Sequence, residues 1–417
     1  MEDSLRGLRV AIVHDWLNQA GGAEIVLHAL KAIFPDAPVY TSMYWPAAVP
    51  DMGGWDIRVS FMDRLPAIHR CHQYYFPLYP LAFERFDFSD YDLVLSNKSG
   101  FCHGVITPAT TPHLCYCLTP TRYLWQTEEY LARERVGAAG RAGLRLILPW
   151  LRRWDQQAAR TRVDAFAAIS TEVQRRVRRF YQRASTVIYP PVDTQRFRPS
   201  ANGARNYYLI LSRLIPYKRI DLAVKAFTEL GRPLVIIGDG RDRPSLEAMA
   251  GPTVRFLGRQ PDDVVEDHLA HCQALIWPGL EDFGLVPVEA QASGRPVIAY
   301  AGGGALDTVI DGVTGTFFHE QTSEALAEAV AGLDPTACDP RAIRQHALQF
   351  DVERFRVNLR RWIRETIADG WPDEGQATDE EPYTLSTRSG QHPAQEQQAS
   401  SVIHPSSLRS TASQPWN

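Results

Sequence analysis

The chain has 417 residues, of which 45% are hydrophobic and 22% charged, and its formal net charge is −4. This length predicts two domains or more, and the weak negative charge argues against a nucleic-acid partner. No apolar run reaches the ~18 residues of a membrane span, and the first ten residues are too polar for a signal peptide. Six scattered cysteines are typical of a reduced, cytoplasmic protein.

The first predicted element is a short buried strand over residues 9–13. A turn with Gly21 and Gly22 follows it, and a helical pattern begins near Ile25. Strand, glycine turn and helix form the opening of a Rossmann-like unit, but the dinucleotide fingerprint GxGxxG is absent. The two glycines let the backbone approach a ligand closely. Asp15 precedes this turn, where a carboxylate can position an acceptor or simply cap a turn.

Further strands are predicted over 91–96, 113–117, 163–170 and 185–189, with a helix over 171–181. Repeated alternation of strand and helix indicates a parallel sheet covered on both faces. The strand 113–117 runs into a polar and aromatic stretch, 118–125, which contains Leu118 and Arg122. Open α/β sheets bind ligands at this end of their strands.

Residues 141–183 carry eleven arginines against three acidic residues, together with Trp150 and Trp154. A basic, tryptophan-bearing amphipathic stretch can lie on an anionic membrane. The alternative is an ordinary surface helix, with one face packed on its own domain and the other exposed to solvent. Pro149 favours that alternative, because a proline is expected to interrupt the helix.

A proline-rich segment, 189–199, and a loop, 200–206, predict the domain boundary. A second α/β series follows, with strands over 207–212, 233–238, 253–257, 274–277 and 296–300. Glycines stand at several strand ends, among them Gly238, Gly240 and Gly258. Strand ends of a parallel sheet meet at one edge, so these turns should converge. Arg213 and Lys218 follow the first of these strands, where cations would neutralise a diphosphate.

Two glutamates, Glu281 and Glu289, stand with seven residues between them. Pro287 is tolerated only in a first helical turn, so a helix should open near Leu285. Its amino end would attract an anion. Glu281 on the loop and Glu289 on the helix would then face the hydroxyl-bearing parts of a ligand.

These segments resemble family 4 of the retaining glycosyltransferases: 212–221 with its Arg and Lys, Gly238-Asp-Gly240, 281–289, Gly21-Gly22-Ala-Glu24 and 189–193. The resemblance covers roughly residues 8–365. It implies the GT-B fold, an α/β architecture of two Rossmann-like domains that face each other across a cleft. Its domains would be 1–199 on the acceptor side, 200–350 for the donor and a returning helix over 351–370. The residues 371–417, rich in Ser, Thr, Gln, Pro and acids, predict a disordered tail.

The resemblance also implies the roles of individual residues. Arg213 and Lys218 would grip the donor diphosphate and Glu281 would lie against the donor sugar, which makes these three the predicted catalytic residues. The rest of the donor site would comprise Gly21, Gly22, Gly238, Gly240, Gly258, Phe283, Gly284, Leu285 and Glu289. Asp15, Leu118 and Arg122 are assigned to the acceptor side. No metal or other cofactor is expected, because cations and a helix end offset the leaving charge.

The stretch 116–125 is most similar to bacterial mannosyltransferases of polysaccharide assembly. We therefore expect transfer of a hexose, with retention, from a nucleoside-diphosphate sugar such as GDP-mannose to a glycan or lipid-linked acceptor. The expected place is the cytoplasm, at the inner face of the cell membrane. In the family a His usually stands at the position of Leu118, and leucine supplies neither a hydrogen bond nor a proton.

His103 and His113 are candidates to replace the missing His spatially. Two other functions stay open on the same fold. One is a sugar-nucleotide epimerase, and the other is a catalytically silent binding subunit, which the presence of Leu118 favours.

Overall fold

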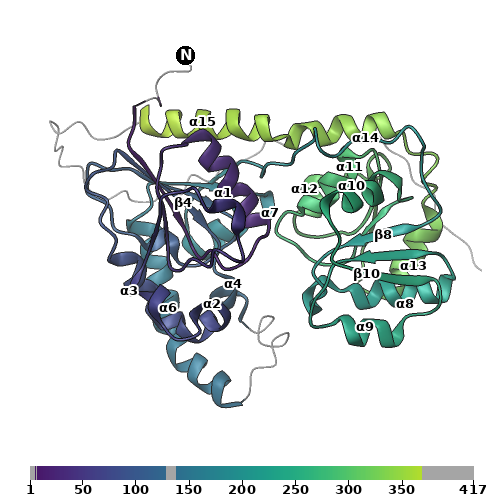
Figure 1. Cartoon of the computed structure of the whole chain (residues 1–417), viewed down its shortest axis with the longest axis horizontal. Helices are drawn as coiled ribbons and strands as arrows, with labels where there is room; N and C mark the ends of the chain where they lie inside the picture. Colours follow the sequence, from purple (N-terminus) through teal and green to yellow (C-terminus); the bar gives the residue numbers. More distant parts are fainter. Residues whose placement is uncertain (1–4, 6, 128–137, 369–417) are drawn as a thin grey trace, which may run out of the picture. The chain divides into compact units, whose positions relative to one another are not determined.

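The computed structural model describes residues 5, 7–127 and 138–368, which belong to one compact unit (Figure 1). Two sheets of parallel strands form its framework, as the sequence predicted. The residues predicted as a disordered tail, 371–417, lie outside the described ranges.

The first sheet has seven strands within the described residues, all parallel. Their spatial order is β3 (Ile57–Val59), β2 (Val39–Thr41), β1 (Val10–His14), β4 (Leu93–Lys98), β5 (His113–Cys117), β6 (Ala165–Ala168) and β7 (Thr186–Val187). Sequence analysis did not predict β2 and β3, which have three residues each. So short a strand carries no readable pattern.

Helices and short turns cover this sheet. The α-helices are α1 (Gly22–Ile33), α2 (Ile68–Cys71), α3 (Tyr79–Glu84), α4 (Arg122–Trp125), α6 (Ala138–Thr161) and α7 (Thr171–Arg176). The 3-10 turns are η1 (Pro50–Met52), η2 (Phe61–Arg64), η3 (His72–Leu78) and η4 (Cys102–Gly104), and α7 continues as one π-helical segment, η5 (Val177–Tyr181).

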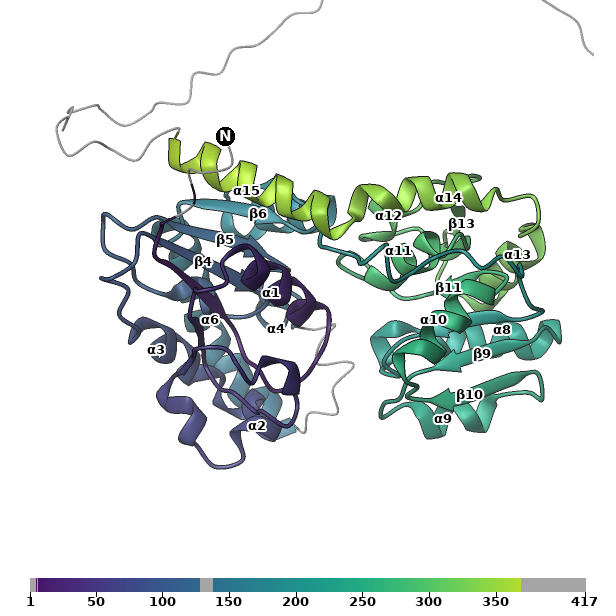
Figure 2. The same cartoon turned by 45° about the horizontal axis from the view of Figure 1, so that its top comes forward.

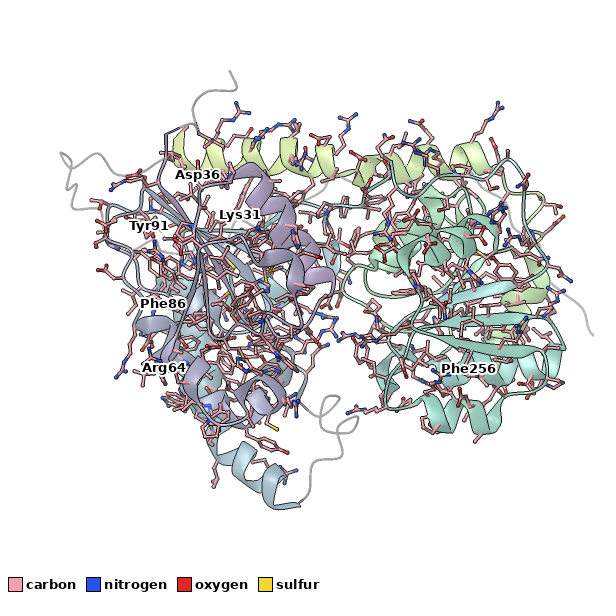
Figure 3. The ribbon with its side chains drawn as sticks, viewed as in Figure 1. Lys31, Asp36, Arg64, Phe86, Tyr91 and Phe256 are labelled. Atoms are coloured by element: carbon pink, nitrogen blue, oxygen red, sulfur yellow. The ribbon has the colours of Figure 1, made fainter. Side chains whose placement is uncertain are left out.

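Successive residues of β1 belong to different hydrophobic clusters. Val10 and Ile12 pack in one cluster and Ala11 and Val13 in another, and all four are buried. Neighbouring side chains of a strand point to opposite faces, so this sheet is covered on both sides. The second cluster ends in an aromatic group in which the Tyr40 ring lies 5.0 Å from that of Phe86 and 6.0 Å from that of Tyr91. Phe86 and Tyr91 are labelled in Figure 3.

The second sheet has six described strands, also parallel. Their order is β10 (Val254–Gly258), β9 (Leu234–Ile237), β8 (Tyr208–Leu211), β11 (Leu275–Trp277), β12 (Val297–Tyr300) and β13 (Gly315–Phe318). The associated helices are η6 (Pro216–Lys218), α8 (Ile220–Leu230), α9 (Arg243–Met249), α10 (Asp262–His271), α11 (Leu285–Ala292), α12 (Ala305–Thr308), α13 (Ser323–Gly332), α14 (Pro340–Ala347) and η7 (Leu348–Phe350).

The chain passes between the two sheets twice, and the two passages run side by side. The amide of Val192 donates to the carbonyl of Phe350 at 2.9 Å, and the amide of Val352 donates to the carbonyl of Val192 at 3.1 Å. The second passage leads into α15 (Val352–Ala368), which lies beside the first sheet near α1 (Figure 2). The ring of Phe355 lies 5.6 Å from that of Tyr116 on β5.

Helix α6 differs from the sequence prediction. It runs through Pro149 without a break, although we expected the proline to interrupt it. Pro149 is exposed, while Leu148 and Leu151 beside it are buried against the domain. Tertiary packing on one face therefore outweighs the local cost of one missing N–H group.

Candidate functional site

A cavity of about 560 Å³ opens where strands of both sheets end. Loops that follow β1, β5, β8 and β11 supply its walls, as expected for the carboxyl edges of parallel sheets. Most residues predicted from the sequence line it: Gly21, Gly22, Leu118, Arg122, Arg213, Lys218, Glu281, Phe283, Gly284 and Leu285.

Two helices begin at this cavity. Helix α11 starts at Leu285, as predicted, directly after Gly284, whose φ of +96° suits a residue without a side chain. Helix α1 starts at Gly22, and a Cβ on that glycine would lie 3.2 Å from the side chain of Leu285. The amino ends of both helices therefore present free N–H groups and partial positive charge to one space, which suits an anion.

Lys218 and Glu281 form an ion pair on the wall of the second sheet. Both side chains are largely buried, and the Lys218 Nζ also lies 4.9 Å from the centre of the Trp277 ring. Arg213 is exposed, and its Nη1 lies 3.4 Å from the Gln19 Oε1 of the other wall. Among the described residues Arg213 has no carboxylate partner, so its charge is available to a ligand.

Asp282 was not predicted, yet it joins the two sheets beside Glu281. Its Oδ2 accepts bonds of 2.6 and 3.1 Å from Arg122. Its Oδ1 accepts a bond of 2.6 Å from Arg176 on α7. Burial alone would raise the pKa of Asp282, but the charges of Arg122 and Arg176 hold it below its usual value. No sequence pattern links these three residues, which lie far apart along the chain.

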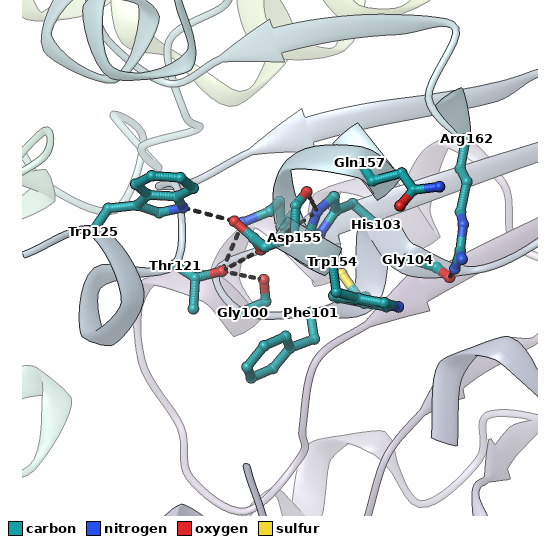
Figure 4. Close-up of polar contacts among 12 residues, drawn as sticks. Gly100, Phe101, His103, Gly104, Thr121, Trp125, Trp154, Asp155, Gln157 and Arg162 are labelled. Atoms are coloured by element: carbon teal, nitrogen blue, oxygen red, sulfur yellow. Dashed lines mark hydrogen bonds and ion pairs between the residues drawn. The ribbon is translucent and has the colours of Figure 1, made fainter. Parts of the chain in front are cut away.

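The segment that carries Leu118 and Arg122 is held in place by Asp155 of α6, which contacts Thr121 and Trp125 (Figure 4). The indole N–H of Trp125 donates to the Asp155 Oδ2 at 2.7 Å, and the hydroxyl of Thr121 lies 3.0 Å from its Oδ1. Arg152 of the same helix donates to the carbonyl of Leu124 at 2.6 Å. Burial raises the pKa of Asp155, and the charge of Lys98 opposes that shift. Helix α6 thus fixes the loop that carries Arg122.

Asp15 does not line the cavity, which corrects its assignment to the acceptor side. Its carboxylate is fully buried and accepts backbone N–H bonds from Ser99, Gly100, Phe101 and Cys102 at 2.6 to 2.8 Å. A carboxylate with both oxygens so occupied fixes the turn after β4. Asp15 therefore caps a turn, which was the second of its two possible roles.

Gly238, Gly240 and Gly258 also lie outside the cavity wall. A Cβ on Gly238 would stand 1.9 Å from the carbonyl oxygen of Ser212, and one on Gly240 would stand 2.2 Å from that of Leu214. Gly258 has a φ of +73°. Gly238 and Gly240 let neighbouring backbone segments pack closely, which gives them a role in the fold. The ligand contact predicted for the three glycines stays a prediction.

Glu289 lies one helical turn beyond Leu285 on α11 and does not line the cavity. Residues four apart share a helix face, so a ligand that extends from the cavity along α11 would meet it. The carboxylate is half-buried and has no hydrogen-bond partner among the described residues. Burial raises its pKa to about 7.

The two histidines considered as replacements at Leu118 do not reach the cavity. His113 is the first residue of β5 and therefore lies at the amino ends of the strands, away from the cavity. Burial lowers its pKa to about 4. His103 is fully buried, and its Nε2 lies 3.1 Å from the carbonyl of Asp155. The histidine that does line the cavity is His14, which sequence analysis did not single out.

Within the described ranges, no cluster of three or more His, Cys, Asp or Glu side chains is placed to hold a metal ion. Among the described residues, no helix combines the length and the apolar character needed to cross a membrane.

Comparison with known proteins finds a family match in the second half of the chain. Residues 191–333 match the model of the family "Glycosyl transferases group 1". A GDP-mannose-dependent alpha-(1-6)-phosphatidylinositol monomannoside mannosyltransferase of Mycolicibacterium smegmatis is 33% identical over 181 residues, 36% of this chain and 47% of the relative. A D-inositol 3-phosphate glycosyltransferase of Mycolicibacterium paratuberculosis is 31% identical over 210 residues, 43% of this chain and 48% of the relative. The chain thus matches about half the length of these relatives.

Two solved structures share the fold over most of the chain. Anabaena HepE, solved with UDP and glucose, has a TM-score of 0.64 and 19% identity, covering 86% of this chain and 99% of its own. Sucrose-phosphate synthase from Thermosynechococcus elongatus has a TM-score of 0.65 and 18% identity, covering 87% and 100%. The protein therefore has the GT-B fold, and its residues 191–333 match the glycosyl transferases group 1 family.

Proposed function

We propose that this protein is a retaining glycosyltransferase that moves a hexose from a nucleoside-diphosphate sugar to a glycan or lipid-linked acceptor. The observation that carries the proposal is the cavity at the carboxyl edges of both sheets. It joins the cations of Arg213 and Lys218, the carboxylate of Glu281 and the amino ends of α1 and α11. A diphosphate fits the cations and the amino end of α11, and sugar hydroxyls fit the carboxylate.

In the proposed reaction the bond between the anomeric carbon and the diphosphate oxygen breaks, and its electron pair leaves with the diphosphate. A bond forms from the acceptor oxygen to the same face of that carbon, and the acceptor's proton passes to the leaving phosphate. Arg213 and Lys218 would stabilise the developing negative charge. We propose no metal for this step, because the two cations and the amino end of α11 supply positive charge.

We propose mannose as the sugar and GDP-mannose as the donor, in cell-surface polysaccharide synthesis. The mycobacterial relative that is named for its use of GDP-mannose supports this choice. UDP-sugars are the next candidates, since the Anabaena structure was solved with UDP.

A thermal-shift panel tests the donor site. It comprises GDP, UDP and ADP, each alone and as its hexose derivative. We expect GDP and GDP-mannose to raise the melting temperature, and Arg213→Ala to abolish the shift. Lys225→Ala is the matched control, because Lys225 is a cation of α8 that does not line the cavity. A wild-type protein that responds to none of these compounds would refute the donor assignment.

We further propose that α6 contacts an anionic membrane surface at the inner face of the cytoplasmic membrane. Leu146 is 83% exposed and Trp150 50% exposed, on one face of the helix, and the exposed Arg145 and Arg153 flank them. Apolar side chains between cations suit the boundary of an anionic bilayer.

Vesicle flotation tests the membrane contact. The wild type should float with phosphatidylcholine vesicles that contain phosphatidylglycerol but not with pure phosphatidylcholine, and the double variant Leu146→Ala, Trp150→Ala should lose flotation. Val357→Ala on α15 is the control, because Val357 is also an exposed apolar residue. Equal flotation of the double variant and the wild type would contradict the proposal.

A second candidate function is donor binding without turnover. The observation that favours it is the apolar side chain of Leu118 on the cavity wall. Hydrolysis or transfer of a bound nucleotide sugar by the natural sequence would exclude this candidate.

A further inference from the structure

A buried pair, His14 and Glu24, forms part of the cavity wall that belongs to the first sheet. His14 is the last residue of β1 and Glu24 lies in the first turn of α1, with exposed fractions of 1% and 4%. The Nε2 of His14 lies 3.4 Å from the Oε1 of Glu24. The donor mechanism proposed above uses neither side chain.

Asn97 determines which ring nitrogen of His14 carries the hydrogen. The amide nitrogen of Asn97 donates to the carbonyl of Ala23 at 2.9 Å and lies 3.2 Å from the His14 Nδ1. An amide NH2 group only donates, so Nδ1 must be the acceptor. The ring hydrogen is therefore on Nε2 and points at the carboxylate of Glu24. The contacts from Asn97 to His14 and from His14 to Glu24 therefore fix the position of Oε1, one of the two carboxylate oxygens.

The second oxygen of Glu24, Oε2, has no hydrogen-bond partner among the described residues, and the residue lines the cavity. A carboxylate this deeply buried is costly unless donors satisfy both oxygens. Within the described residues, His14 is its one ion-pair partner. The remaining donors must come from what occupies the cavity.

The charge of Glu24 selects the kind of group that it can bind. A carboxylate repels a phosphate, and the cations that attract phosphate, Arg213 and Lys218, follow strand β8 of the other sheet. A sugar or polyol hydroxyl, by contrast, donates a hydrogen bond to a carboxylate. Glu24 therefore suits the hydroxyl that must approach the donor sugar from the side of the first sheet.

We propose that Glu24 binds and orients the attacking hydroxyl of the acceptor, and that His14 and Asn97 are positioning residues for it. The inference rests on the proposed function. It also bears on Leu118, which follows β5 at the same sheet edge, two strands from β1 and therefore roughly 10 Å away. The polar group that Leu118 lacks is supplied from β1 and α1.

Water is the smallest hydroxyl acceptor, so donor hydrolysis tests Glu24 without knowledge of the natural acceptor. We would measure the kcat of hydrolysis of GDP-mannose and UDP-glucose, and the Kd for GDP and UDP by titration calorimetry. Glu24→Gln should lower kcat at least tenfold, in line with the ~10²-fold cost of misplacing a reacting group by about 1 Å. It should leave the nucleotide Kd within twofold of the wild type, because Glu24 does not touch the diphosphate.

Asp221→Asn is the matched control. Asp221 is the acidic residue in the first turn of α8, pairs with Arg219 and lies outside the cavity. Its substitution should leave both kcat and Kd unchanged. His14→Ala should lower kcat with an unchanged Kd, and His14→Gln should recover part of the loss because its amide again offers an N–H to Glu24. If Glu24→Gln does not fold, this His14 pair carries the test.

Two results would overturn the assignment of Glu24. One is a hydrolysis kcat that Glu24→Gln leaves at the wild-type value. The other is a nucleotide Kd that weakens tenfold or more, which would place Glu24 at the donor diphosphate. Failure of the proposed function is separate, because a wild type that neither binds nor hydrolyses any nucleotide sugar would show it without any variant.

Discussion

The ion pairs of Asp282 should contribute measurably to folding, and Asp282→Asn tests this. The substitution keeps the shape of the side chain and removes the anion that Arg122 and Arg176 share. Two charge-assisted ion pairs of about 1.5–3 kcal/mol each give an upper range of about 3–6 kcal/mol. The Arg122 side chain is 30% exposed and regains some water, and Arg176 keeps Glu172 at 2.9 Å. We therefore expect a loss of about 3 kcal/mol in the free energy of unfolding.

Urea denaturation at pH 7 measures this loss, and its pH dependence provides a second check. The pKa of Asp282 is depressed in the folded state from its usual 3.8. Its stabilisation is therefore fully present above that value and is lost as pH falls through the depressed folded pKa. The difference between wild type and Asp282→Asn should be constant from pH 7 to pH 5 and shrink below pH 4.

Arg175→Met is the control, because Arg175 lies on the same helix, pairs with Glu172 and is 61% exposed. It should cost less than about 0.5 kcal/mol. An Asp282→Asn protein as stable as the wild type at pH 7 would refute the reasoning, and so would a loss that does not change down to pH 3.

Three further predictions concern the cavity. Lys218→Ala should reduce nucleotide-diphosphate affinity at least tenfold in calorimetry, because it removes a cation and leaves Glu281 without its partner. Lys225→Ala serves again as the control. An unchanged affinity of the Lys218→Ala protein would contradict the donor assignment. Nucleotide binding should weaken as pH falls from 8 to 6 and Glu289→Gln should remove that dependence, because the Glu289 carboxyl has a pKa of about 7. Because that pKa is raised in the folded state, the contribution of the neutral Glu289 carboxyl to folding stability is lost as pH rises through 7. The Glu289→Gln protein should therefore have a higher melting temperature than the wild type at pH 8, but not at pH 5. Leu118→His should leave the rate of donor hydrolysis within twofold of the wild type, because His14 and Glu24 already supply a polar group on this wall. A tenfold rise would contradict that assignment.

Much of the fold could be predicted because the strands that matter most are long enough to show a pattern. The strand at 113–117 was placed to the residue, and the start of α11 at Leu285 followed from Pro287. The two strands of three residues at 39–41 and 57–59 were missed for the opposite reason. Pro149 was judged by its local cost alone, whereas the buried neighbours in α6 determine the outcome.

The site was predictable where one segment carries its own signal, as 281–285 and Arg213 with Lys218 do. Asp282, Arg176 and the pair His14 and Glu24 were missed, because their roles arise from contacts between segments. Sequence analysis assigned several glycines to the ligand site that do not line the cavity. The same lack of a side chain that lets Gly22 reach the cavity lets Gly238 and Gly240 pack against neighbouring backbone, and sequence does not separate the two uses.

The return of α15 to the first sheet has a consequence for fragments of this chain. Leu359, Trp362 and Ile363 are buried in the same cluster as the strands of the first sheet, although they lie more than 150 residues beyond β7 (Thr186–Val187) in sequence. An amino-terminal fragment that stops at the linker would expose that apolar surface and should aggregate. Supplying 350–368 as a separate peptide should restore the solubility of the fragment. The first sheet therefore needs this carboxy-terminal segment to fold, and a cut at the linker alone does not yield two independent domains.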